Sequence, residues 1–397
     1  MLHLDKLMAT YSKEEVLVIL ITRVYFASED VQKVHDFISR STIDWDKFYE
    51  LITLNTIRGF IYEVITDANI SIDTRIYDNL KKDAMRISLV ASYHADLTGT
   101  LIKDFEKMGI TVIPYKGYTL ATRYYKTPYF REGSDLDFLV SKDDIDQLTA
   151  YLEDNGHTPK FAVSAHQMDF VIRFHRELAY AGPRNKIGIS CSVEIKWKLL
   201  ENYFHKSYDY DFFVKHLETY TSTDGSSLQV LTPTYNFIAV SYHHLIREPL
   251  LKFKYLVDLA CIIQTSAKQL DWKIIDSHFK ENNFSPFLGS GINALQDIIG
   301  FEHSSVLEAQ PIPYHLFTVR KYRSVQQYYY MRCKLVNAKL SLSHKLRHSF
   351  KVYLALFVPN LKDLSQTKAP SWTIPMITPV KCVRFLYQHI VKKKHID

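Results

Sequence analysis

The sequence predicts an α+β protein in which a small mixed sheet lies between two helical regions. Apolar residues recur every three or four positions over roughly the first hundred residues and again after Pro233, which is the spacing of helices that bury one face. Between these regions, short β-branched runs alternate with helical segments. We therefore expect a helical region at 1–109, a core with the sheet at 110–230 and a second helical region at 231–397.

The amino-terminal region carries helix start and stop signals. In "YSKEEVLVILITRVYF", Ser12 and Glu15 predict a capping box followed directly by an apolar stripe. In the next helical stretch, Thr42 or Asp44 is the predicted cap. A long helix with charges on its outer side follows, and Gly109 is placed to end it.

The core opens with "ITVIPYKG", a predicted strand closed by a glycine, followed by a helical segment and then the strand "DLDFLV". "KDDIDQLTAYLEDNG" predicts a further helix. Three later stretches, "AVSAHQMDFVIRF", "RELAYAG" and "SCSVEIKWKL", are predicted to be additional strands of the same sheet, with "GPRNKIG" as a turn.

Composition narrows the classes of protein. The chain of 397 residues is 47% hydrophobic, which is typical of an ordered globular protein. A net charge of +6 is compatible with an anionic substrate such as a nucleotide, but it is too small to indicate a nucleic-acid-binding protein. The cysteines are far apart, which argues against a zinc knuckle or a disulfide framework and favours a cytoplasmic location; they are Cys191, Cys261, Cys333 and Cys382.

No stretch has the features of a secretory signal peptide or of a transmembrane segment. "FLYQHIVKKK" and "FKVYLALFVP" have the character of basic amphipathic segments, so contact with a membrane surface is an alternative to the packed helices that we favour there. The basic end "VKKKH" is most simply a solvated tail, although a polyanionic partner is an alternative.

The stretch "GSDLDFLV" places two acids at the start of an apolar strand. Alternate side chains of a strand point to the same face, so Asp135 and Asp137 are predicted to project together. Two carboxylates this close repel each other, and a bound divalent cation keeps both ionised. Magnesium is commonly held by one or two carboxylates together with substrate phosphates, so the pair suits a metal-bound nucleoside triphosphate.

Other residues would complete such a site. Glu194 in "SVEIKW" supplies a third acid if its strand neighbours that of Asp135. Lys116 and Gly117 in "PYKGYTLA" stand where a strand meets a helix, a position that attracts phosphate. Arg131, just before the acids, offers a forked donor to a phosphate.

This order of motifs resembles the uncharacterised nucleotidyltransferase family of the polymerase-β-like nucleotidyltransferase superfamily, found in bacterial gene clusters. The similar stretches cover most of the chain and are "IDWDKFYELITLNTIRGFIY", "GITVIPYKG", "REGSDLDFLV", "FHREL", "VEIKW" and "HHLIREPLLKFKYLVDLACII". The resemblance implies a polymerase-β-like core, Mg²⁺ or Mn²⁺ as cofactor, and a nucleoside triphosphate such as ATP as co-substrate.

The resemblance also implies roles for individual residues. Asp135, Asp137 and Glu194 would hold the metal, with Glu194 either a ligand or the base for the incoming hydroxyl. The phosphates would lie against Lys116, Gly117, Arg131, Gly133 and Ser134. The resemblance further marks His175 and Glu177, either to bind the acceptor or to brace the sheet.

The chain departs from the family pattern at two places. The superfamily usually has a Gly-Ser or Gly-Gly pair in the first turn, where this chain has Lys-Gly-Tyr and a longer spacing to the acids. Lys196 stands where relatives often have a histidine after the third acid, which puts the acceptor or the role of the base in question.

Other polar residues of the helical carboxyl half have two interpretations. His243 and His244 lack a ligand-like partner one turn away, so a packed or surface role is favoured over metal binding. The helix with Lys252, Lys254 and Asp258, preceded by Arg247, either faces the nucleotide, as the resemblance implies, or has a solvated charged face.

The predicted function is transfer of a nucleoside monophosphate to an unidentified acceptor with release of pyrophosphate. Acceptors compatible with the site are a small molecule, a glycan precursor, a peptide or a protein. Two alternatives are a toxin-type nucleotidyltransferase acting on tRNA and a non-catalytic interaction scaffold with the same fold.

Overall fold

The computed structural model describes residues 1–204, 208–221, 227–301, 311–318 and 341–367, together with 373 and 379. Its contacts divide the chain into two compact units. Unit 1 is Met1–Leu136 with Val214–Lys339, and unit 2 is Asp137–Phe213 with Leu340–Asp397. The boundary therefore falls within a single strand, between Leu136 and Asp137. The division into 1–109, 110–230 and 231–397 remains a prediction.

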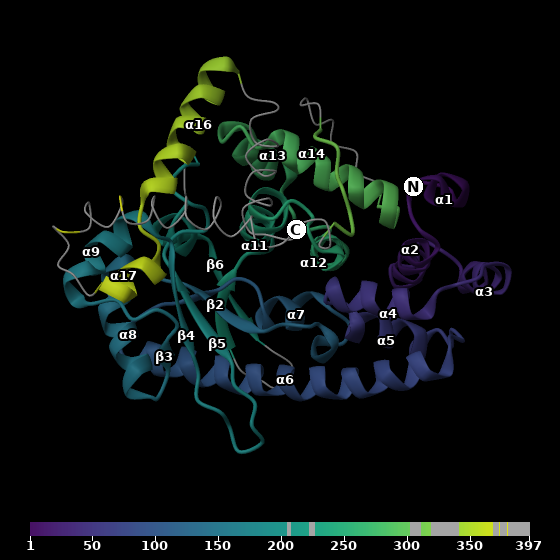
Figure 1. Ribbon diagram of the computed structural model, residues 1–397, viewed down its shortest axis with the longest axis horizontal. Helices are drawn as coiled ribbons and strands as arrows, with labels where there is room; N and C mark the ends of the chain where they lie inside the picture. Colours follow the sequence, from purple (N-terminus) through teal and green to yellow (C-terminus); the bar gives the residue numbers. More distant parts are fainter. Residues whose placement is uncertain are drawn as a thin grey trace, which may run out of the picture. The chain divides into compact units, whose positions relative to one another are not determined.

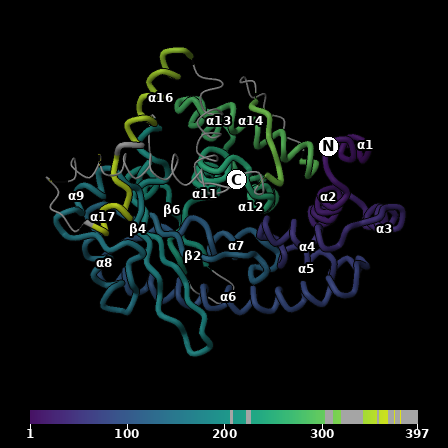
Figure 2. Tube along the Cα trace, viewed as in Figure 1, coloured from purple at the N-terminus to yellow at the C-terminus, as the bar shows by residue number. Residues whose placement is uncertain are grey.

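Unit 1 begins with a cluster of helices. These are α1 (Leu4–Thr10), α2 (Lys13–Tyr25), α3 (Val31–Arg40), α4 (Trp45–Leu54), α5 (Arg58–Asp67) and α6 (Thr74–Lys107). Helix α2 contacts α3, α4 and α5, and these helices lie together at the purple end of the trace in Figure 2. The long helix α6 runs alongside α4 and α5 (Figure 1).

Local signals set the ends of these helices. The Ser12 side chain accepts from the Glu15 amide and Glu15 accepts from the Ser12 amide, so the predicted capping box is confirmed. Asp44, rather than Thr42, caps α4 by accepting from the Lys47 amide at 3.1 Å. Gly109, at φ 76°, follows α6 in the left-handed conformation that commonly ends a helix.

The remainder of unit 1 contains three short elements, then a hairpin and a second set of helices. The short elements are β1 (Ile113–Pro114), α7 (Tyr118–Tyr124) and η1 (Pro128–Phe130). The later ones are η3 (Val214–His216), β6 (Leu217–Thr221), β7 (Ser227–Leu231), α11 (Pro233–Ser241), the π-helical turn η4 (Tyr242–Arg247), α12 (Phe253–Ser266), α13 (Trp272–Glu281), α14 (Ser285–Ala294) and the π-helical turn η5 (Leu295–Ile299). The buried Arg23 of α2 donates to the Ile298 carbonyl at 2.6 Å and so links the two ends of this unit.

Unit 2 is built on strands and helices that alternate along the chain. After β2 (Asp135–Leu139), which begins in unit 1, come η2 (Lys142–Asp144), α8 (Ile145–Asp154), β3 (Thr158–Pro159), α9 (Ala165–Phe174), β4 (Glu177–Ala181), β5 (Ser192–Lys196), α10 (Tyr210–Phe213), α16 (Leu342–Phe357) and α17 (Leu361–Thr367). The protein is therefore of the predicted mixed α and β class.

The sheet places the chemically important strands side by side. Its strand order is β1-β2-β5-β4-β3, so β5 lies next to β2 although more than fifty residues separate them. The Val140 amide, directly after β2, donates to the Lys196 carbonyl at 2.7 Å. Strand β4 pairs antiparallel with β5, with Ala179 opposite Glu194. The predicted strands "RELAYAG" and "SCSVEIKWKL" and the turn between them are confirmed.

One predicted strand is wrong. The stretch "AVSAHQMDFVIRF" forms helix α9 instead of a strand. At its start the Ser164 amide donates to the Gln167 side chain at 3.2 Å, which satisfies a backbone donor that a strand would have paired with a neighbour. Gln167 and Val171 are its buried residues, and their spacing of four is helical. The β-branched and aromatic residues of this stretch favour a strand, but the spacing of its buried residues is that of a helix.

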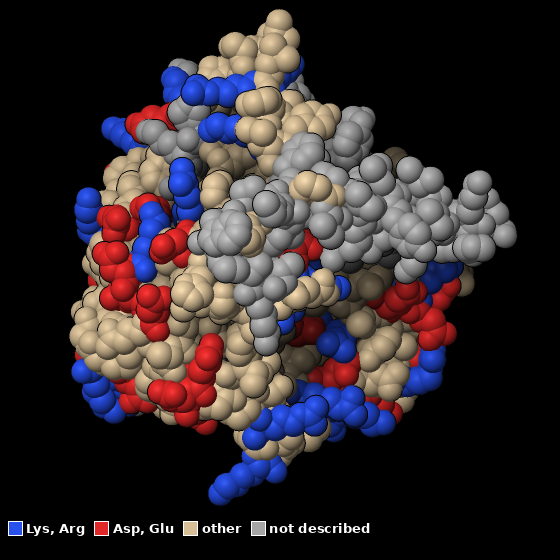
Figure 3. Space-filling view, turned by 60° about the vertical axis from the view of Figure 1, so that its left-hand side comes forward, with Lys and Arg blue, Asp and Glu red and all other residues tan. Residues whose placement is uncertain are grey.

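In the part of the chain that the structure describes, no helix is long and apolar enough to cross a bilayer. Helix α16 contains most of "FKVYLALFVP" and is packed on only part of its surface, because His348 is buried whereas Phe350 and Tyr353 are exposed. Acidic and basic side chains both occur across the face shown in Figure 3. Cys191 and Cys261 are buried thiols. The tail "VKKKH", the stretch "FLYQHIVKKK", Cys333 and Cys382 lie outside the described residues.

Candidate functional site

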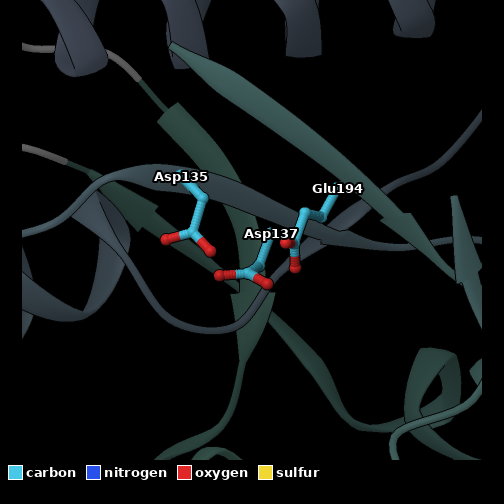
Figure 4. Close-up of side chains that lie close together, drawn as sticks. All are labelled: Asp135, Asp137 and Glu194. Carbon is cyan, nitrogen blue, oxygen red and sulfur yellow. The ribbon is translucent and has the colours of Figure 1, made fainter. Parts of the chain in front are cut away.

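Three acidic side chains meet at the start of β2. Asp135 and Asp137 alternate along β2, and Glu194 comes from β5. Each offers one carboxylate oxygen, and these three oxygens lie within 4.8 Å of one another, with the carboxylates turned toward a common point (Figure 4). Asp137 is buried, whereas Asp135 and Glu194 are partly exposed. The strand order of the sheet has thus brought the third acid to the pair.

The donor set of this acid cluster fits a divalent cation. All three ligands are carboxylate oxygens, which are preferred by hard ions such as Mg²⁺ and Mn²⁺. Leu136 and Phe138, which alternate with the acids, are only 3% and 1% exposed. Their burial fixes the strand and therefore the direction in which the two aspartates project. The acid cluster therefore offers three carboxylate oxygens as candidate ligands for one such ion.

Lys196 lies at the same place and is almost completely buried, with 1% of its surface exposed. Its Nζ is 3.0 Å from Oδ1 of Asp137 and also contacts Glu177 and Glu194 closely. Glu177 in addition pairs with Arg176. The ammonium group thus lies among three carboxylates, two of which belong to the acid cluster.

A tight turn in unit 1 precedes the acids. Gly117 has φ 67° and ψ −134°, a conformation that is strained for any residue with a Cβ. A Cβ at Gly117 would lie 3.3 Å from the Asp135 carbonyl oxygen, so the turn packs closely on the start of β2. Lys116 is partly exposed, and its Nζ lies 5.9 Å from the centre of the Tyr115 ring.

Arg131 is held within unit 1 by a buried carboxylate. Its Nε and Nη2 each donate to Asp258 at 2.8 Å, and its Nη1 donates to the Gly117 carbonyl at 3.1 Å. Burial raises the pKa of Asp258, but Arg131 and a hydrogen bond with His244 outweigh that effect and hold the pKa well below its usual range. The Arg131 guanidinium, which we predicted to bind a phosphate, is directed at Asp258. Its hydrogen bond to the Gly117 carbonyl also holds the turn in place.

The polar residues of η4 and α12 are mostly buried. Asp258 and His244 are 0% and 2% exposed, and His244 Nε2 lies 2.9 Å from Asp258. His244 therefore has the packed role that we favoured over metal binding. Asp258 is buried and Lys254 is half-buried, so a solvated face does not describe this part of α12.

The surroundings of Lys254 lead us to expect that the stability of unit 1 depends on pH. Its ammonium group donates to the Glu132 carbonyl, and burial, followed by repulsion from Arg131, lowers the pKa of Lys254 to about 7. In the unfolded chain the pKa of lysine is about 10.4. Between these two values the unfolded state binds the extra proton, so the free energy of unfolding rises with pH across this window.

We expect a pH-dependent difference in stability between the natural protein and Lys254→Met. From pH 7 to pH 10 the natural protein should gain about 3–5 kcal/mol relative to the variant, because it no longer has to bury a charged lysine. Urea denaturation of both proteins at several pH values measures this difference. A difference that stays constant from pH 7 to 10 would show that Lys254 keeps its proton when folded.

A pocket of about 280 Å³ lies in unit 1. Its lining includes Gly117, Arg131 and Gly133 from the predicted site, together with Arg58, Arg86 and His94 from the amino-terminal helices. Arg58 pairs with Glu132 at 2.7 Å. Burial lowers the pKa of His94, while the charge of Asp135 opposes that shift.

Sequence reasoning missed the contribution of α5 and α6 to this pocket. Arg58, Arg86 and His94 occupy helices whose apolar spacing indicates only packing. The one available signal was that "NTIRGF", with Arg58, belongs to a stretch similar to the family. That resemblance assigned no role to the arginine.

The remaining predicted residues have different surroundings. Gly133 and Ser134 are exposed, and the Ser134 hydroxyl lies 3.4 Å from Oδ1 of Asp135. His175, at the end of α9, contacts the Pro359 carbonyl at 3.0 Å through Nε2. His175 contacts a backbone carbonyl and Glu177 contacts Lys196. Both contacts favour the interpretation that these two residues brace the sheet rather than bind the acceptor.

A mixed α and β fold with three carboxylate oxygens around one point is compatible with an enzyme that binds a metal ion together with phosphate groups. The chain is a member of the uncharacterised nucleotidyltransferase family, whose family model matches residues 41–300. No curated protein matches the chain. No solved structure matches it either.

Proposed function

We propose that this protein is a metal-dependent nucleotidyltransferase that moves a nucleoside monophosphate from a nucleoside triphosphate to an acceptor. The observation that carries the proposal is the acid cluster of Asp135, Asp137 and Glu194. Membership of the family supports the same type of reaction. The proposal includes a polymerase-β-like core in which the phosphates lie in the pocket, beside Lys116, Gly117, Gly133 and Ser134. It also includes a cytoplasmic location.

The reaction joins an acceptor oxygen to the α-phosphorus of the triphosphate. The bond from that phosphorus to the bridging oxygen breaks, and pyrophosphate leaves. Glu194 accepts the proton of the acceptor hydroxyl. Asp135 and Asp137 would hold Mg²⁺ or Mn²⁺, which would supply positive charge to the phosphates. The turn at Gly117, fixed by Arg131, orients the triphosphate so that the α-phosphorus faces the acceptor.

The first test is binding of each labelled nucleoside triphosphate with and without Mg²⁺ or Mn²⁺. We expect binding that requires the metal and that weakens at least about tenfold in Asp135→Ala and in Asp137→Ala, since each removes a carboxylate ligand. The exposed Asp154 at the end of α8 provides a control, and Asp154→Ala should bind as the natural protein does.

The outcomes also separate the alternative functions. Binding that persists without metal and without either aspartate would contradict the mechanism. Absence of any triphosphate binding with metal present would favour an interaction scaffold. Metal-dependent binding together with a nucleotide-dependent mass increase of added tRNA, abolished by Asp137→Ala, would favour the toxin-type activity.

A further inference from the structure

We propose that Lys196 takes the place of one metal ion, so that the acid cluster binds a single divalent cation, held by Asp135 and Asp137. The inference rests on the proposed function, because it concerns the metal that the nucleotidyl transfer requires. It goes beyond that function in assigning to Lys196 a position that other two-metal enzymes give to an ion.

The position of the ammonium group is the first argument. Nζ of Lys196 is 3.0 Å from Asp137 Oδ1 and lies closer still to Glu194 Oε2. A Mg²⁺ ion bridging Asp137 and Glu194 would need to be about 2.0–2.1 Å from an oxygen of each. The ammonium group therefore occupies the space between these two acids, where such an ion would lie.

The geometry of the sheet keeps the lysine there. Lys196 is the last residue of β5, and its carbonyl accepts from the Val140 amide at 2.7 Å. Glu177 of β4, opposite Lys196 in the strand pairing, contacts the same ammonium group. With 1% of its surface exposed, Lys196 has little room to swing away.

The charges give the second argument. Asp135, Asp137, Glu177 and Glu194 place four carboxylates near one lysine. Carboxylates gathered at one place require partners of opposite charge, and Lys196, together with Arg176 at Glu177, neutralises only part of this set. Asp135, which offers the remaining oxygen of the acid cluster, can then share one divalent ion with Asp137. A second divalent ion would have to displace a buried, multiply paired ammonium group.

Binding of Mn²⁺ to the nucleotide-free protein tests this directly, with free Mn²⁺ followed by its electron paramagnetic resonance signal. We expect one Mn²⁺ per chain for the natural protein. Lys196→Gln should bind two, the first about tenfold more tightly or better, because a positive charge next to the ion has been removed. Lys198→Gln should behave as the natural protein does, since the buried Lys198 contacts Asn202 and two carbonyls rather than the acid cluster.

Two Mn²⁺ ions, or none, in the natural protein would overturn the inference, as would identical binding by Lys196→Gln. Because the natural protein alone gives a decisive count, poor folding of the variant does not obscure the result. The double variant Glu177→Gln/Lys196→Gln loses one charge of each sign and should also bind two ions. No nucleotide is present, so failure of triphosphate binding is a separate outcome that contradicts the proposed function alone.

Discussion

Asp258→Ala should lower the free energy of unfolding by about 3–5 kcal/mol, because it leaves the Arg131 guanidinium buried without its carboxylate. The side chains of Arg131 and Asp258 are 6% and 0% exposed, so water cannot replace the lost partner. His244 loses a hydrogen-bond partner at the same time. Urea denaturation followed by circular dichroism measures the loss.

Two further variants make this stability test specific. Asp46 pairs with Arg75 at 2.8 Å on the surface, with side chains 75% and 62% exposed, so Asp46→Ala should cost at most about 1 kcal/mol. Arg131→Met/Asp258→Leu removes both charges and should be more stable than Asp258→Ala. A loss below about 1 kcal/mol in Asp258→Ala would mean that the buried pair is unimportant for the fold.

Glu194→Gln should slow nucleotidyl transfer by about 10²–10⁴-fold and leave metal-dependent triphosphate binding within a few-fold of the natural protein. The amide cannot accept the proton of the acceptor, whereas Asp135 and Asp137 still hold the cation. Pyrophosphate release under single-turnover conditions measures the transfer, and equilibrium dialysis measures the binding.

Asp137→Asn is the comparison for the Glu194 variant. It should lose both binding and transfer, since Asp137 is proposed as a metal ligand. If Glu194→Gln lost triphosphate binding to the same extent as Asp137→Asn, then Glu194 would be a metal ligand rather than a base. That result would also contradict the assignment of Lys196 as the partner of Glu194.

Several parts of the fold could be predicted because they depend on neighbouring residues. The Ser12–Glu15 capping box, the end of the long helix at Gly109 and the strands β2, β4 and β5 follow from local spacing. Helix α9 was predicted wrongly for a related reason. Its aromatic and β-branched residues suit a strand, and only its cap and the burial of Gln167 and Val171 distinguish the helix.

In the candidate site, too, some features follow from neighbouring residues and others depend on the tertiary structure. That Asp135 and Asp137 project together follows from the period of two in a strand. That Glu194 joins them required the pairing order of the sheet, and the pocket required Arg58 and His94 from helices with ordinary apolar patterns. Sequence alone offered Arg131 to the phosphates, whereas its partner is Asp258, 127 residues away.

The sequence by itself therefore determined the mixed fold class and the paired aspartates, because each depends on residues that are neighbours in the chain. Only the tertiary structure decided that Lys196 lies between Asp137 and Glu194 and that Arg131 pairs with Asp258. The physical reason is that a charged side chain is held by whichever opposite charge the folded chain buries beside it. Spacing along the sequence does not specify that neighbour.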